Sequence, residues 1–143
     1  MTHPRKAYRD AVRTALSAHA DLSGVAACRA WALPKNDEEL PAFTVVTRDE
    51  RVEMDTGDNA SRNVELAVVL KCAGGDEIED TLDGYSEAIE AVVIDVLDSW
   101  PTELPFYQVT RVLTQVEGGS KKRIGTLEIH FAITRYADEG AQS

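Results

Sequence analysis

Apolar and polar residues alternate with two different periods along the chain, and this pattern predicts two helices and five strands. Apolar residues recur every three or four positions over residues 4–20 and 78–100, as on a helix with one buried face. Residues 27–33, 43–47, 62–72, 106–116 and 124–136 instead alternate, or are rich in β-branched and aromatic residues, as strands are. The predicted order is α-β-β-β-α-β-β. We therefore expect an α+β fold with two helices packed on one face of a mainly antiparallel or mixed sheet.

The second helix has the clearest predicted boundaries. Gly74 and Gly75 suit a turn, and Asp76 with Glu79 matches a capping box, so we expect Asp76 to cap the helix. Pro101 ends it. The exposed face of this helix has no basic residue, and its acidic residues are Glu77, Asp80, Asp83, Glu87, Glu90, Asp95 and Asp98. The first helix carries the opposite charge on its exposed face, at Arg5, Lys6, Arg9 and Arg13.

The last predicted strand indicates which side of the sheet is the core. Its apolar face consists of Leu127, Ile129, Phe131 and Ile133. The other face is mostly polar, and we expect it to be free of the core; it consists of Thr126, Glu128, His130 and Thr134. His130 beside Glu128 resembles a proton-transfer pair, but no nucleophile is near in sequence, so we favour a surface position for His130.

Residues 48–60 separate two predicted strands and are mostly charged, with turn residues at their end. We interpret them as a long hairpin loop, or as a hairpin whose tip leaves the body of the domain. The segment has too few apolar residues to offset its ordering entropy, so we expect it to be mobile in a free subunit. Val52 and Met54 are its candidate apolar anchors for a partner.

Length and charge restrict the class of protein. The 143 residues suit one domain, which we place at 1–137, followed by a flexible tail at 138–143. A net charge of −10 disfavours binding to nucleic acid or to an anionic membrane. No stretch resembles a signal peptide or a membrane span. Cys28 and Cys72 are isolated from each other and from histidine, as reduced cytosolic thiols are, and a disulfide between them is the less favoured alternative.

The sequence contains few candidates for catalytic or ligand-binding residues. The glycine pairs lack a phosphate-binding motif, and His3, His19 and His130 lack the spacing of zinc ligands. Carboxylates four residues apart on the second helix suit a hard cation, but a solvated helix face is the better interpretation. We therefore expect no catalytic residue, no cofactor and no metal.

Three stretches resemble one protein family. They are Leu-Pro-Ala-Phe-Thr-Val-Val at 40–46, Arg-Asn-Val-Glu-Leu-Ala-Val-Val-Leu-Lys-Cys at 62–72 before the long helix, and Gly-Thr-Leu-Glu-Ile-His-Phe-Ala-Ile-Thr-Arg-Tyr at 125–136. With the order of elements, they resemble the tail terminator (minor tail protein U) family of long-tailed bacteriophages, with relatives in prophages and gene transfer agents.

The resemblance implies a structural protein without catalytic residues. It would form a hexameric ring on the finished tail tube, stop tube polymerisation and present a surface for head joining. The implied partners are its own copies, the tail-tube protein and a head-completion or connector protein, with DNA passing through without specific binding. The implied location is the host cytoplasm during assembly and then the virion tail.

Candidate interface residues come from the charge pattern alone. We expect Arg9 and Arg13 to meet acidic residues of the second helix, within a subunit or across subunits. The full candidate interface is Arg9, Arg13, Arg48, Asp49, Glu50, Arg51, Val52, Met54, Asp80, Asp83, Glu87, Lys121, Lys122 and Arg123. The candidate lumen-facing or tube-facing set is Thr126, Glu128, His130 and Thr134. The alternatives are another neck protein (head-closure or tail-completion), a small metal- or ligand-binding domain built on the carboxylate helix and, last, an enzyme.

Overall fold

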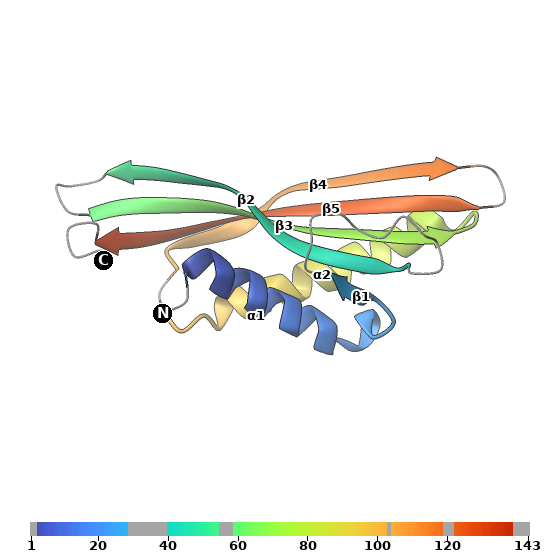
Figure 1. Ribbon diagram of the computed structural model, residues 1–143, viewed down its shortest axis with the longest axis horizontal. Helices are drawn as coiled ribbons and strands as arrows, with labels where there is room; N and C mark the ends of the chain where they lie inside the picture. The colour runs from blue at the N-terminus through green and yellow to red at the C-terminus, as the bar shows by residue number, and fades with distance from the viewer. Residues whose placement is uncertain (1–2, 29–39, 55–58, 103, 119–121, 139–143) are drawn as a thin grey trace.

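Two helices lie along one face of a five-stranded sheet in the computed structural model, which describes residues 3–28, 40–54, 59–102, 104–118 and 122–138 (Figure 1). The elements are α1 Pro4–Ala18, the short 3-10 helix η1 Ala20–Leu22, β1 Ala26–Cys28, β2 Ala42–Met54, β3 Asn59–Gly74, α2 Ile78–Asp98, β4 Phe106–Gly118 and β5 Arg123–Asp138. The predicted α+β class, the order of the elements and the placement of both helices are confirmed.

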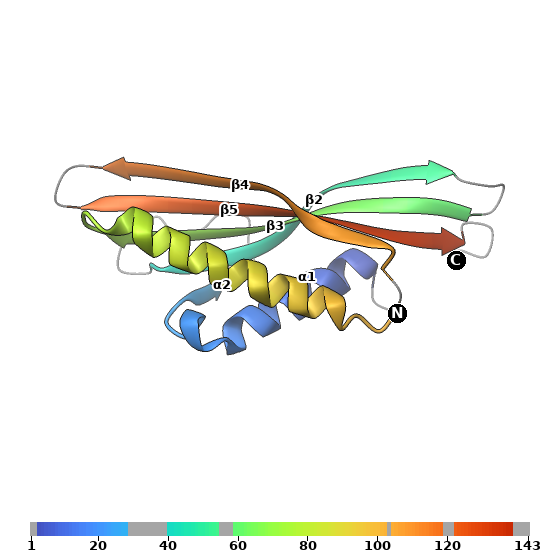
Figure 2. The same cartoon turned by 180° about the vertical axis from the view of Figure 1, so that it is seen from behind.

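The strands lie in the order β1-β2-β3-β5-β4. β2 and β3 form one antiparallel hairpin, β4 and β5 form another, and β3 pairs antiparallel with β5 to join the two. β1 pairs with β2 in parallel over three residues, so the sheet is mixed. α2 connects β3 to β4 and runs beneath β5 and β4 when the molecule is seen from behind (Figure 2).

The core lies between the sheet and both helices. Leu127, Ile129, Phe131 and Ile133 are fully buried there, which confirms the predicted core face of the last strand. α1 contributes Tyr8, Val12 and Leu16, and α2 contributes Ile78, Leu82, Ile89, Val93 and Leu97. At one position the helix approaches the sheet closely: a Cβ on Gly125 would lie 2.9 Å from Leu82 Cδ1. A glycine in β5 therefore allows α2 to pack directly on the strand.

The predicted cap of α2 at Asp76 is wrong. The helix begins at Ile78, its N-cap residue is Glu77, and no side chain caps it. A backbone hydrogen bond of 3.3 Å, donated by the Ile78 N–H to the Gly75 carbonyl, closes a turn just before the helix. This turn places Asp76 outside the helix, where its carboxylate lies 3.7 Å from the Arg123 guanidinium at the start of β5.

The predicted loop at 48–60 is also wrong in its described part. β2 continues to Met54, and Asp49 to Met54 pair residue by residue with Glu65 to Ala60 of β3. Those residues of β3 pair in turn with β5. The backbone hydrogen bonds between the three strands therefore offset the conformational entropy lost on ordering, for which the few apolar side chains alone do not suffice. The distal parts of the three strands extend past the N-terminal end of α1, as expected for a hairpin that leaves the body of the domain (Figure 1). Residues 55–58 lie outside the described part.

Other boundaries shift slightly. α1 ends at Ala18 rather than at residue 20, and of the strand predicted at 27–33 only the part up to Cys28 is described. β5 ends at Asp138, and the rest of the predicted tail lies outside the described residues. Cys28 and Cys72 are free thiols. Among the described helices, none is both long and apolar enough to cross a membrane.

Candidate assembly surfaces

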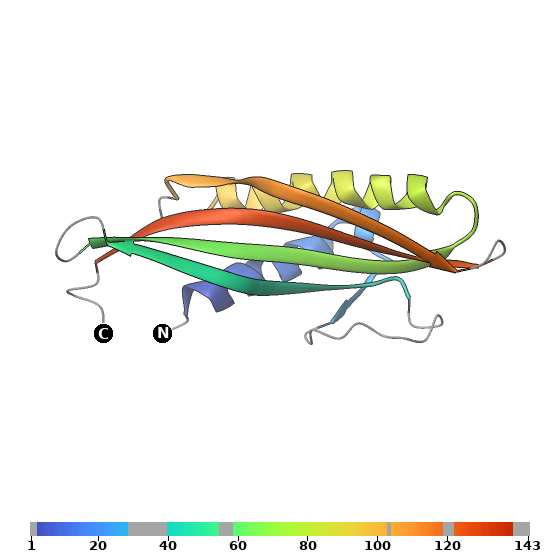
Figure 3. The same cartoon turned by 90° about the horizontal axis from the view of Figure 1, so that it is seen from above.

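The distal extension, which we define as residues 51–54, 59–63 and 134–138, projects beyond the helices (Figure 3). A β-bulge between Thr47 and Asp49 changes which side chains of β2 share the core face. After the bulge Glu50 is paired with the buried Val64, so Glu50, Val52 and Met54 lie on the core side. Val52 and Met54 are 47% and 57% exposed, because the helices do not reach them. They form an apolar pair at the end of the molecule.

The charges around the distal extension pair locally. Arg62 Nη1 lies 3.0 Å from Glu50 Oε2, and the two side chains are only 22% and 10% exposed. Arg51 Nε lies 3.5 Å from Asp49 Oδ2, but this pair is exposed and contributes little. Arg48 Nη2 lies 3.2 Å from Glu128 Oε1 on β5. Arg48 and Glu50, which were predicted to contact a partner, thus form ion pairs with β5 and β3 of the same subunit.

The helix-free face of β5 carries the four predicted lumen-facing residues. The predicted surface position of His130 is wrong, because its side chain is buried with 5% residual exposure. Its Nε2 lies 3.2 Å from Glu128 Oε1 and its Nδ1 lies 3.4 Å from Glu65 Oε2. It stands between Ala67 of β3 and Arg111 of β4 in the register. This polar cluster joins β5 to β3, and a role facing a lumen stays a prediction.

Thr134 occupies the same face nearer the end of β5. Its hydroxyl donates a hydrogen bond to the side-chain oxygen of Asn63 on β3. Thr126 is half-buried at the other end of the strand. The four positions therefore share one face, as the alternation predicts.

The basic residues of α1 do not meet the acidic residues of α2 within the described part of this subunit. Arg9 Nη1 donates a 2.6 Å hydrogen bond to the Thr47 hydroxyl of β2, and Arg13 Nη1 lies 3.1 Å from Asp10 Oδ1. Asp80, Asp83 and Glu87 are exposed on α2. Charge pairing between the two helices therefore remains a prediction only for contacts across subunits.

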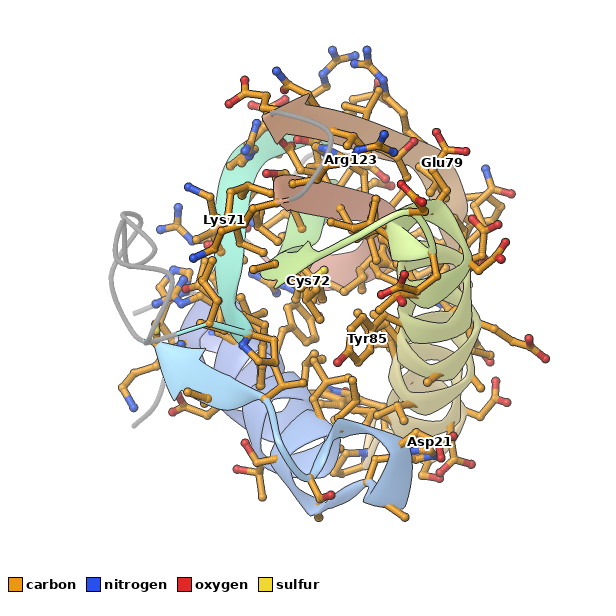
Figure 4. The ribbon with its side chains drawn as sticks, turned by 90° about the vertical axis from the view of Figure 1, so that its right-hand side faces the viewer. Asp21, Lys71, Cys72, Glu79, Tyr85 and Arg123 are labelled. Carbon is orange, nitrogen blue, oxygen red and sulfur yellow. The ribbon has the colours of Figure 1, made fainter. Side chains whose placement is uncertain are left out.

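A cavity of about 550 Å³ lies between η1 and α2. Asp80 and Glu87 line it together with Asp21, His19 and Tyr85. Figure 4 shows Asp21 near α2 at the η1 side of the molecule, and Glu79 away from it at the N-terminal end of the same helix. The cavity is open and acidic, and it lacks an arrangement of ligands that would define a bound group.

The β4–β5 turn places the last predicted basic group at the opposite end of the sheet from the distal extension. Lys122 is exposed, Arg123 lies beside Asp76, and Lys121 is outside the described residues. Gly118 has a φ of +113°, and a Cβ there would lie 2.6 Å from the Lys122 carbonyl oxygen. Glycine is therefore required at this turn.

The outer edge of β4 is a surface that the sequence pattern did not reveal. β4 is the last strand of the sheet, and every residue from Thr110 to Glu117 is exposed. Val112, Leu113 and Val116 are 43%, 36% and 36% exposed. Their alternation indicates a strand, but only the strand order shows that this strand lies at the edge.

Metal-ligating groups and thiols are the reactive groups to locate among the described residues. No three His, Cys, Asp or Glu side chains among them are grouped to hold a metal. Burial raises the pKa of the Cys72 thiol, so Cys72 stays protonated and unreactive. Figure 4 shows Cys72 and Tyr85 in the interior between β3 and α2, with Lys71 on the outer side of the same strand. Burial, and secondly Cys72, raise the pKa of Tyr85.

Comparisons with known proteins add a fold relationship. No protein-family model matches the sequence, and no curated protein matches it. Among solved structures, the chain is similar to a chain of the "Virion of native gene transfer agent (GTA) particle", with a TM-score of 0.57 and 16% sequence identity. The match covers 94% of this chain and 100% of that chain. The two chains therefore share one fold over nearly their whole length.

Proposed function

We propose that this protein is a structural component of a phage-like particle, and that it caps the completed tail tube as a hexameric ring. The observation that carries the proposal is the similarity in fold to a chain of a gene transfer agent virion, which covers 94% of this chain. The resemblance of residues 40–46, 62–72 and 125–136 to the tail terminator family supports the same class of particle and a position at the end of the tail tube. The ring would stop tube growth and form the surface on which the head joins.

The distal extension supports a docking role. It projects beyond the helices and ends in the exposed pair Val52 and Met54. Exposed apolar side chains on a rigid ladder suit contact with another rigid surface, because little conformational entropy is lost on binding. We assign this end of the molecule to the tail tube or to the neighbouring subunit of the ring.

Charge supports passage of DNA through such a ring. Each copy carries a net charge of −10, so six copies would carry about −60. Binding to phosphate depends on Lys and Arg, and a ring of this charge would repel DNA rather than retain it. A structural role also agrees with the buried, protonated thiol of Cys72 and with the contacts of the His130 ring to Glu65 and Glu128.

Co-purification tests the proposal and its nearest alternative. Tagged protein, produced in cells that make the particles, should recover the tail-tube protein. Val52→Asp with Met54→Asp should lose this recovery while the melting temperature is unchanged, because both side chains are exposed. Glu53→Gln, on the other face of the same strand, is the matched control and should retain recovery. Recovery of portal or head-closure protein without tube protein would instead assign the chain to another neck position. Recovery of no particle protein would refute a structural role.

A further inference from the structure

The β4 edge is open along a regular stretch of strand. β4 pairs with β5 on one side, and no described strand pairs with its other side. A bulge lies between Val109 and Arg111, and from Arg111 to Gly118 the pairing with β5 is uninterrupted. An unpaired edge with exposed apolar side chains is a template for another strand.

The sequence of this stretch is complementary to itself in the antiparallel direction. It reads Arg-Val-Leu-Thr-Gln-Val-Glu from 111 to 117. When a second copy is placed antiparallel about Thr114, Arg111 stands opposite Glu117, Val112 opposite Val116, and Leu113 opposite Gln115. Residues directly opposite each other lie on the same face of a sheet, so both charges fall on the helix-free face and both valines fall on the helix side.

We propose that two copies of this chain pair antiparallel through β4, about a two-fold axis at Thr114. The pairing joins two five-stranded sheets into one continuous sheet and gives two Arg111–Glu117 pairs and two Val112–Val116 pairs. It satisfies the open backbone groups of the edge and covers its exposed valines. This dimer is a property of the free protein and does not rest on the proposed function.

The other edge of the sheet is a poorer match for β4. β1 is only three residues long, and beyond it the edge of β2 carries Asp49, Glu50, Arg51 and Glu53. Strands rich in charge oppose edge pairing. The apolar and charged residues of β4 are instead complementary to those of β4 in a second, antiparallel copy.

Charge reversal tests the register. Sedimentation of the wild-type protein over a range of concentrations should show a reversible dimer. Arg111→Glu or Glu117→Arg alone places like charges opposite each other twice per dimer, and should weaken the dimer roughly tenfold or more. The double variant Arg111→Glu/Glu117→Arg restores opposite charges and should recover the wild-type dimer. All three should melt as the wild type does, since both positions are exposed.

Cysteine cross-linking tests the two-fold axis, in a Cys28→Ser background. Thr114→Cys should form a disulfide-linked dimer, because residues directly opposite have Cα atoms about 4.5–5.5 Å apart, within disulfide range. Val112→Cys is the matched control: its two copies would lie about 14 Å apart along the strands, at about 3.4 Å per residue, and should not cross-link. A wild-type protein that stays monomeric, a double reversal that stays as weak as the single variants, or equal cross-linking at both cysteines would overturn the proposal.

Discussion

Truncating Phe131 tests the assignment of the two faces of β5. Phe131 is fully buried and stands between Leu66 of β3 and Val109 of β4 in the register. Phe131→Ala removes a fully buried ring from the core between the sheet and the helices, and the loss of contacts together with the remaining cavity should cost about 3–5 kcal/mol. For a chain of this length each kcal/mol corresponds to roughly 3–4 °C, so the melting temperature should fall by roughly 9–20 °C.

The matched control is Thr134→Ala, three residues farther along β5 on the helix-free face. This change removes a methyl group and one hydrogen bond to Asn63, and should cost about 0.5–1.5 kcal/mol. Thermal melting and denaturant titration of both variants measure the difference. If Thr134→Ala lowers stability as much as Phe131→Ala, the assignment of the core face is wrong.

Three further predictions concern the strand ends and the core. Removing residues 51–59 and closing the hairpin with a short turn should abolish tail completion. The melting temperature should change by only a few degrees, because Val52 and Met54 are exposed; a variant that fails to fold would show that the extension is part of the core. Arg62→Ala should lower stability by about 1–3 kcal/mol in denaturant titration, because Glu50 is only 10% exposed, whereas Arg51→Ala should have almost no effect; equal effects would contradict the importance of the Glu50 pair. Burial raises the pKa of Tyr8 above the ordinary 10.0, so the stability that its protonated form contributes is complete below pH 10 and is lost as the pH rises through the folded value. Tyr8→Phe should therefore flatten the fall in melting temperature above pH 10, and an unchanged fall would contradict the effect of burial.

Elements with a strong apolar period were predictable from the sequence. The alternation of Leu127, Ile129, Phe131 and Ile133 determines which face of β5 is buried, because a strand that packs on one side can bury only one set of alternate residues. The stripe on α2 determines the helix in the same way, and Pro101 determines its end. These signals are local, and the fold class follows from their order.

Features that depend on neighbouring strands were not predictable. Glu50 to Met54 has only two apolar residues, Val52 and Met54, and it is a strand because β3 and then β5 supply partners. His130 lies on the polar face of its strand, yet Glu65 and Glu128 contact its ring and Ala67 and Arg111 flank it. Asp76 matches a capping box, but its contact with Arg123 belongs to a strand 47 positions later (123 − 76). In each case at least one of the partners lies far away in the sequence.

The exposed edge of β4 illustrates the same limit. Val112, Leu113 and Val116 are typical of any strand, and a central strand would have buried them. Their exposure follows from the strand order β3-β5-β4, because β5 pairs with β3 and leaves β4 at the edge of the sheet. Only this order makes the self-complementary stretch available to a second copy.

Tail length in cells that lack this protein is the most direct test of the proposed function. Inactivating its gene in the strain that makes the particles, followed by electron microscopy, should show tail tubes of uncontrolled length without heads. Supplying the wild-type protein should restore tails of uniform length joined to heads. Headed particles with tails of normal length in its absence would contradict the assignment of this chain as the cap of the tail tube.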